Sequence, residues 1–83
     1  MVWQIFYSQK AADDFRKLDK TIKIQAKKKI EKLSCNPELG KPLGNIYKNK
    51  RSLHVGKFRI LYSFNSKQIT IARISHRKKA YRA

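Results

Sequence analysis

The sequence predicts an α+β domain, in which helices cover one face of an antiparallel sheet. Three observations support this prediction: an apolar N-terminal segment of strand type, two consecutive segments with apolar residues at helical spacing, and a C-terminal half in which apolar and polar residues alternate. A strand, then helices, then a run of strands is the element order of this fold class. The chain has 83 residues, which is enough for one domain spanning 1–83.

The N-terminal half is expected to form a strand followed by two helices. Residues 2–7 read VWQIFY, a β-branched and aromatic segment typical of a strand. Ser8 and Asp19 are suited to cap the two helices that follow, and Asn36-Pro37 ends the second. The apolar positions of the first helix are Ala11, Ala12, Phe15 and Leu18, and those of the second are Ile22, Ala26, Ile30 and Leu33. The connection between them is short, which predicts an antiparallel helical hairpin.

The C-terminal half is expected to form three antiparallel strands. Residues 36–45 are rich in Pro and Gly and indicate a loop, and residues 46–55 indicate a short, irregular strand. Residues 57–64 alternate, with Phe58, Ile60, Tyr62 and Phe64 on one face. Residues 65–67 indicate a turn, 68–74 a returning strand and 75–83 a basic tail. Arg59 then lies on the face opposite the aromatic row, where its guanidinium can meet a phosphate.

The charge of the chain is strongly positive and unevenly distributed. There are 21 Lys/Arg against 5 Asp/Glu, a net charge of +16, and every acidic residue lies in the first 38 residues. Residues 39–83 therefore form an uncompensated cationic half, which favours binding to nucleic acid because each phosphate contact releases counterions. An acidic protein partner would satisfy the same field, and the two partners are not exclusive.

The remaining composition points to a cytoplasmic protein. The single Cys35 excludes an intramolecular disulfide and a multi-cysteine metal site, and a reducing compartment suits it. No apolar run approaches the ~18 residues of a membrane span. The N-terminus lacks the basic-then-apolar pattern of a signal peptide. We expect no membrane partner, cofactor or metal.

Two segments of the cationic half resemble the pattern of the RelE/ParE toxin superfamily. They are HVGKFRILY at 54–62 and ISHRKKAY at 74–81, which are similar to R-V-G-x-Y-R-I-I-Y and I-x-H-R-x-x-x-Y. The resemblance implies a RelE-like fold and a toxin neutralised by a small acidic antitoxin, similar to RelB. It implies one of two activities: RelE-like members cut mRNA on the ribosome, whereas ParE-like members poison DNA gyrase without catalysis of their own. A degenerate member without toxicity is a third reading.

The candidate site residues follow from the resemblance and from the chemistry of RNA cleavage. Attack by the 2′-hydroxyl needs a base, a stabiliser of charge on phosphorus and an acid for the leaving 5′-oxygen. The resemblance implies that Arg59 is the stabiliser and that Arg77 is a second phosphate clamp. It implies that Tyr81 stacks on a base or orients the 2′-hydroxyl. It also implies a role for Lys48 and Lys50, which match the family's Y-K-x-K stretch, although the distance from this stretch to the arginine differs by two residues from that in the family. His54 and His76 are possible acids or bases. The remaining cations expected to contact RNA are Arg51, Lys57, Arg73, Lys78 and Lys79. The cationic charge favours the RNA-cutting activity.

Overall fold

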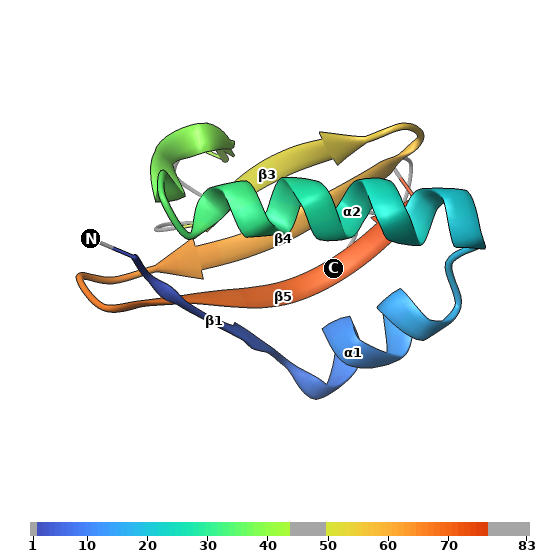
Figure 1. Cartoon of the computed structure of the whole chain (residues 1–83), viewed down its shortest axis with the longest axis horizontal. Helices are drawn as coiled ribbons and strands as arrows, with labels where there is room; N and C mark the ends of the chain where they lie inside the picture. The colour runs from blue at the N-terminus through green and yellow to red at the C-terminus, as the bar shows by residue number, and fades with distance from the viewer. Residues whose placement is uncertain (1, 44–49, 77–83) are drawn as a thin grey trace.

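The computed structural model describes residues 2–43 and 50–76, and these form the predicted α+β fold (Figure 1). The element order is strand, two helices and then strands. The elements are β1 (Gln4–Tyr7), α1 (Gln9–Arg16), α2 (Lys20–Leu33), a 3₁₀ helix η1 (Pro37–Leu39), β2 (Lys41–Pro42), β3 (Lys50–Val55), β4 (Phe58–Phe64) and β5 (Gln68–His76).

The sheet has five strands in the order β1-β5-β4-β3-β2, and it is mixed rather than wholly antiparallel. The three strands predicted in the C-terminal half are β3, β4 and β5, and they pair antiparallel. β1 joins them in parallel beside β5, and the two-residue β2, in a segment expected to be a loop, pairs with β3. The strand expected from residue 46 begins at Lys50, and residues 44–49 lie outside the described part of the chain.

Both helices begin at the capping residues that the sequence indicates. The Ser8 side chain accepts the N–H of Ala11 at 3.0 Å, and Asp19 accepts the N–H of Ile22 at 2.9 Å. α1 packs mainly on β5, whereas α2 packs on β3 and η1, so the sheet holds each helix separately (Figure 1). The predicted pair of consecutive helices is present, and side chains of both helices line a common pocket, with Ala12, Phe15 and Arg16 from α1 and Lys27 from α2. No helix in the described ranges is long and apolar enough to cross a membrane.

The core lies between the helices and one face of the sheet. It contains three of the four predicted stripe residues of α2, while the fourth, Ile22, is partly buried against it. Its members are Ala11, Leu18, Ala26, Ile30, Leu33, Leu53, Val55, Ile60, Tyr62, Ile69, Ile71 and Ile74. The buried residues of β5 are Ile69 and Ile71 in its first part and Ile74 in its last part, so the alternation shifts by one residue between Ile71 and Ile74. The register with β4 shifts between Leu61 and Tyr62, which leaves Ala72 as an extra residue on β5. This bulge returns Ile74 to the core face after Ile71.

Tyr62 anchors the segment around η1 to the sheet. Its hydroxyl donates to the carbonyl of Pro37 at 2.7 Å and accepts the N–H of Gly40 at 2.8 Å. A Cβ on Gly40 would lie 2.7 Å from this hydroxyl oxygen and 2.8 Å from the carbonyl oxygen of Ser52, which leaves room only for glycine. Burial raises the pKa of the Tyr62 phenol above its usual value, while the hydrogen bond from Gly40 and the charge of Arg51 act in the opposite direction.

Candidate nucleic-acid interface

Arg59 lies on the face of the sheet that the helices do not cover. It is directly opposite His54 on β3 and Ser75 on β5. The next row across the same strands is Leu53, Ile60 and Ile74, all buried in the core. Because adjacent rows of a sheet point to opposite faces, Arg59 points away from the core, as the sequence predicts. Its Nη1 donates to the hydroxyl of Ser52 at 3.1 Å, and the side chain is half-buried.

Two further predicted site residues share this face with Arg59. Lys50 lies two residues before Ser52 on β3 and His54 lies two residues after it, and both therefore project to the same side as Arg59. Lys57 is exposed in the β3–β4 turn, next to Gly56, whose φ of 58° suits a tight turn. Strands β2 to β5 contain no acidic residue, so no carboxylate on these strands compensates the cations.

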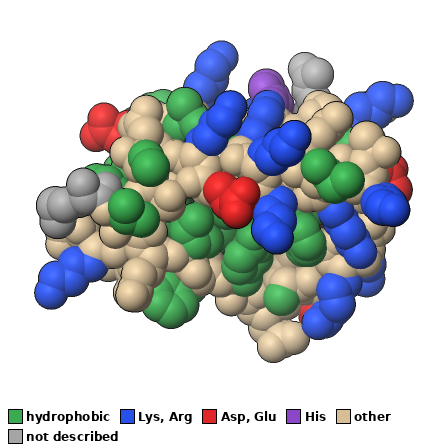
Figure 2. Space-filling model, in the orientation of Figure 1, with side chains coloured by type: hydrophobic (Ala, Val, Ile, Leu, Met, Phe, Trp, Pro, Cys, Tyr) green, Lys and Arg blue, Asp and Glu red, His purple; other side chains and the backbone are tan. Residues whose placement is uncertain are grey.

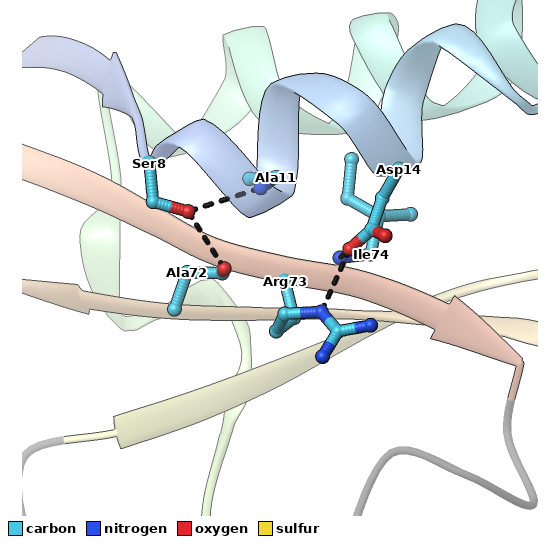
Figure 3. A network of polar contacts seen from close by, with 6 residues as sticks. All are labelled: Ser8, Ala11, Asp14, Ala72, Arg73 and Ile74. Carbon is cyan, nitrogen blue, oxygen red and sulfur yellow. Dashed lines mark hydrogen bonds and ion pairs between the residues drawn. The ribbon is translucent and has the colours of Figure 1, made fainter.

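Arg73 is placed near this face but its charge is partly neutralised. On β5 it is opposite Leu61, and its Nε donates to Asp14 of α1 at 2.9 Å (Figure 3). The same carboxylate oxygen accepts the backbone N–H of Ile74 at 3.0 Å. Nearby, the Ser8 hydroxyl donates to the carbonyl of Ala72 at 2.8 Å (Figure 3). The side chains of Ser8 and Asp14 thus form hydrogen bonds with backbone groups of β5 that lie beyond the end of β1.

Two other predicted site residues lie away from Arg59. Arg51 is opposite Tyr62 on the core side, where its Nη1 donates to the carbonyls of Gly40 at 2.8 Å and Glu38 at 3.3 Å. Its guanidinium also lies 5.8 Å from the centre of the Phe64 ring. His76 is opposite Phe58, with the two rings edge to face at 5.8 Å, and it lines a hollow beneath α1 with Asp14. The structure therefore assigns Arg51 to the support of the η1 segment and separates the two histidines.

The other candidates lie outside the described residues. They are Lys48, Arg77, Lys78, Lys79 and Tyr81. Sequence reasoning did not single out Ser52, which contacts Arg59, or Lys41, which is opposite Ser52 on β2. The Pro and Gly residues around Lys41 indicated a loop, and no local signal places this lysine beside the Arg59 row.

The helix-covered face carries a second feature, an apolar pocket rimmed by cations. Figure 2 shows Lys and Arg side chains gathered around α2, with apolar side chains exposed beneath them. The pocket has a volume of about 410 Å³ and is lined by Tyr7, Ala12, Phe15, Arg16 and Lys27. The rings of Tyr7 and Phe15 meet edge to face at 6.2 Å. Burial, together with the negative charge of Glu31, raises the pKa of the Tyr7 phenol.

Comparison with solved structures defines the class of the fold. A chain of the toxin–antitoxin complex RelBE2 from Mycobacterium tuberculosis is 27% identical, with a TM-score of 0.80 over 93% of this chain and 100% of that chain. A doubly substituted variant of the E. coli toxin RelE in the free state is 19% identical, with a TM-score of 0.82 over 96% of this chain and 88% of that chain. A chain of the E. coli DinJ–YafQ toxin–antitoxin complex is 21% identical, with a TM-score of 0.70 over 98% and 99%. The fold is therefore that of the RelE-like toxins.

The family assignment comes from the sequence. The family model of the ParE toxin of the type II toxin–antitoxin system parDE matches residues 5–81. The chain belongs to this family and hence to the RelE/ParE superfamily, which confirms the resemblance seen in residues 54–62 and 74–81. No curated protein sequence matches the chain.

Proposed function

We propose that this toxin is an endonuclease that cuts mRNA on the ribosome and thereby stops translation. The observation that carries the proposal is the row of Arg59 and His54 on the helix-free face, with Lys50 on the same side of β3. An exposed face of strands that contain cations and no carboxylate suits the phosphates of a single RNA strand. Membership in the family makes the chain a toxin of a type II system, and the proposal concerns its target.

The proposed chemistry is attack of the ribose 2′-hydroxyl oxygen on the adjacent phosphorus. A P–O bond forms to the 2′-oxygen as the P–O5′ bond breaks, and the products are a 2′,3′-cyclic phosphate and a 5′-hydroxyl. The guanidinium of Arg59 stabilises the charge that accumulates on the phosphoryl oxygens. His54 is directly opposite Arg59, and its imidazole is a candidate for the proton exchange.

The resemblance to the family completes the proposed site. It assigns Lys48 or Lys50 to proton transfer, Arg77 to a second phosphate contact, and Tyr81 to base stacking or orientation of the 2′-hydroxyl. No Asp or Glu side chain occurs after residue 38, so the candidate bases in this half of the chain are a histidine or a lysine.

The test is expression of the toxin in a translation extract, with primer extension on a reporter mRNA. Cleavage within codons that depends on added ribosomes is the expected result. Intact mRNA at toxin concentrations that stop growth of a producing strain would refute the proposal.

A second candidate function is inhibition of DNA gyrase, which the match to the ParE family model favours. In that case the basic face would meet a protein or its bound DNA, and no residue of this chain would be catalytic. Gyrase-dependent DNA breaks in the same cells, together with intact mRNA, would select this candidate.

We also infer an acidic antitoxin as partner, because homologous toxins have been crystallised with antitoxins such as RelB and DinJ. The pocket of Tyr7 and Phe15 offers apolar contact, and Arg16 and Lys27 at its rim complement a segment that alternates apolar and acidic side chains. The face around Arg59 is also positively charged, and it offers a second contact for an acidic antitoxin.

A further inference from the structure

A small cationic pocket lies at the edge of β3, beyond the point where β2 ends. Its volume is about 190 Å³. Its polar lining is Lys29, Lys41, Ser52, His54 and Arg59, which come from α2, β2, β3 and β4. Leu39 and Leu53 contribute apolar surface, and the described part of the chain places no acidic side chain in the lining.

The strand register explains why four of these side chains converge. Lys41 is directly opposite Ser52 across β2 and β3, and His54 is directly opposite Arg59 across β3 and β4. Residues that are opposite, or two apart on one strand, project to the same face. The hydrogen bond of 3.1 Å from Arg59 Nη1 to Ser52 Oγ connects the two pairs.

Lys29 brings a further positive charge to the pocket from the helix layer. Its Nζ donates to the backbone carbonyl of His54 at 2.5 Å, at a position of β3 that β2 does not reach. This hydrogen bond fixes the ammonium at the strand edge. The pocket therefore collects three permanent cations, Lys29, Lys41 and Arg59, together with a hydroxyl donor. Such a concentration of like charge is unfavourable unless an anion occupies it.

We propose that this pocket binds a backbone phosphate of single-stranded RNA, next to the scissile phosphate at Arg59. The proposal rests on the proposed function and adds Lys41 and Lys29 to it as substrate-positioning residues. Lysine, arginine and serine side chains are the usual ligands of nucleic-acid phosphates, and they fix the register of the strand. Leu39, which is 45% exposed at this pocket, provides an apolar surface for the adjoining ribose or base.

The experiment measures binding of a 2′-O-methyl RNA oligonucleotide, which cannot be cut because it has no 2′-hydroxyl. The variants are Lys41→Gln and Lys29→Gln, and the glutamine in the second keeps a donor for the His54 carbonyl. Each lost phosphate contact should reduce the slope of log K against log salt by about 0.7, which lowers affinity roughly fivefold at ~0.1 M salt. Lys67→Gln, an exposed lysine in the β4–β5 turn, is the matched control and should keep the parent slope.

A scan with single methylphosphonates identifies the phosphate. One position should weaken the parent and leave the Lys41→Gln variant unchanged, because that variant has already lost the contact. In ribosome assays the variant should raise KM with kcat retained, which distinguishes positioning from catalysis. The proposal that the pocket binds a phosphate would be overturned if both variants kept the parent's slope of log K against log salt, or if no methylphosphonate position showed this pattern. If the parent binds RNA through Lys41 but does not cut mRNA on ribosomes, the pocket stands and the nuclease proposal fails.

Discussion

Asp14 and Arg73, 59 residues apart in the sequence, form an ion pair of 2.9 Å between a carboxylate oxygen and Nε. The same oxygen accepts the backbone N–H of Ile74, so one residue of α1 both pairs with a cation and provides a hydrogen-bond acceptor for the edge of β5 (Figure 3). The ion pair is half-exposed on the Arg73 side, and the bond to the strand backbone is the more sheltered contact.

Replacement of Asp14 should destabilise the fold more than its surface position suggests. Asp14→Ala leaves the Ile74 N–H without its acceptor, and we expect a loss of about 1–3 kcal/mol in the free energy of unfolding. Asp13→Ala is the matched control, because Asp13 contacts the side chains of Arg16 and Gln9 on the exposed side of α1, and its loss should cost less than ~1 kcal/mol. Urea unfolding of both variants measures the difference, and equal losses would contradict the role of the β5 edge.

The apolar stripe of α2 should account for a large part of the stability. Ile30 is 2% exposed in the core, and Ile30→Ala should cost about 2–5 kcal/mol, enough to unfold much of a small domain. Ile24, on the same helix and 50% exposed, is the control, and Ile24→Ala should be near neutral because alanine favours a helix. Thermal unfolding followed by circular dichroism checks both. Similar melting temperatures for the two variants would show that the helix register is wrong.

The hydrogen bonds of the Tyr62 hydroxyl should hold the η1 segment in place. Tyr62→Phe removes the partner of the buried Gly40 N–H and of the Pro37 carbonyl, and we expect a loss of about 1–3 kcal/mol. Gly40→Ala should destabilise as well, because its Cβ would meet the backbone carbonyl of Ser52 at 2.8 Å. Denaturant unfolding measures both. A neutral Gly40→Ala would mean that the segment shifts freely.

The raised pKa of Tyr62 also predicts a dependence on alkaline pH. The phenol is neutral in both states below its ordinary pKa of 10.0, so its contribution to stability is complete there. Above this pH the unfolded chain ionises first, and the contribution is lost as the pH rises through the folded-state pKa. The difference in stability between the parent and Tyr62→Phe should therefore shrink above about pH 10. A constant difference up to pH 12 would contradict the shift.

Arg59 should act mainly on the transition state of RNA cleavage. Arg59→Ala should lower single-turnover cleavage on programmed ribosomes by about 10²–10³, with a much smaller effect on ribosome binding, which many other cations share. Arg59→Lys should restore activity only in part, because an ammonium lacks the two-pronged geometry of a guanidinium. Arg16→Ala, on exposed α1, is the control. Cleavage by Arg59→Ala at the parent rate would show that the site is misplaced.

The hydroxyl of Tyr81 separates two roles that the family resemblance allows. Tyr81→Phe should retain most activity if the ring only stacks on a base. If the hydroxyl takes part in proton transfer, cleavage should fall while binding is unchanged. Single-turnover rates and separately measured ribosome affinity distinguish the two, and a loss of both rate and affinity would match neither.

Binding of the antitoxin should weaken as salt concentration rises, because exposed charges are screened over ~8 Å at physiological ionic strength. Lys27→Gln, at the rim of the Tyr7 and Phe15 pocket, should reduce this dependence, whereas Lys67→Gln should not. Isothermal calorimetry at several salt concentrations measures the effect. An affinity indifferent to salt would refute electrostatic neutralisation.

The sequence by itself determined the features that depend on neighbouring residues. Ser8 and Asp19 mark the starts of both helices because a cap acts within one turn, and the stripe through Ile30 follows from the period of the helix. The alternation in residues 57–64 placed Arg59 on the face opposite the core residues, because side chains of a strand point to alternate faces. The charge distribution needs no structure at all.

Only the tertiary structure decided how distant segments meet. The parallel pairing of β1 with β5, the short β2 beside Ser52 and the bulge at Ala72 depend on contacts between residues far apart in sequence. Strand register then decided which cations share a face, since a shift of one residue reverses every side chain. It placed His54 with Arg59, assigned Arg51 to the core side and brought Lys41 beside Ser52 in the cationic pocket, because pairing between strands, and not local sequence, sets the neighbours of each side chain.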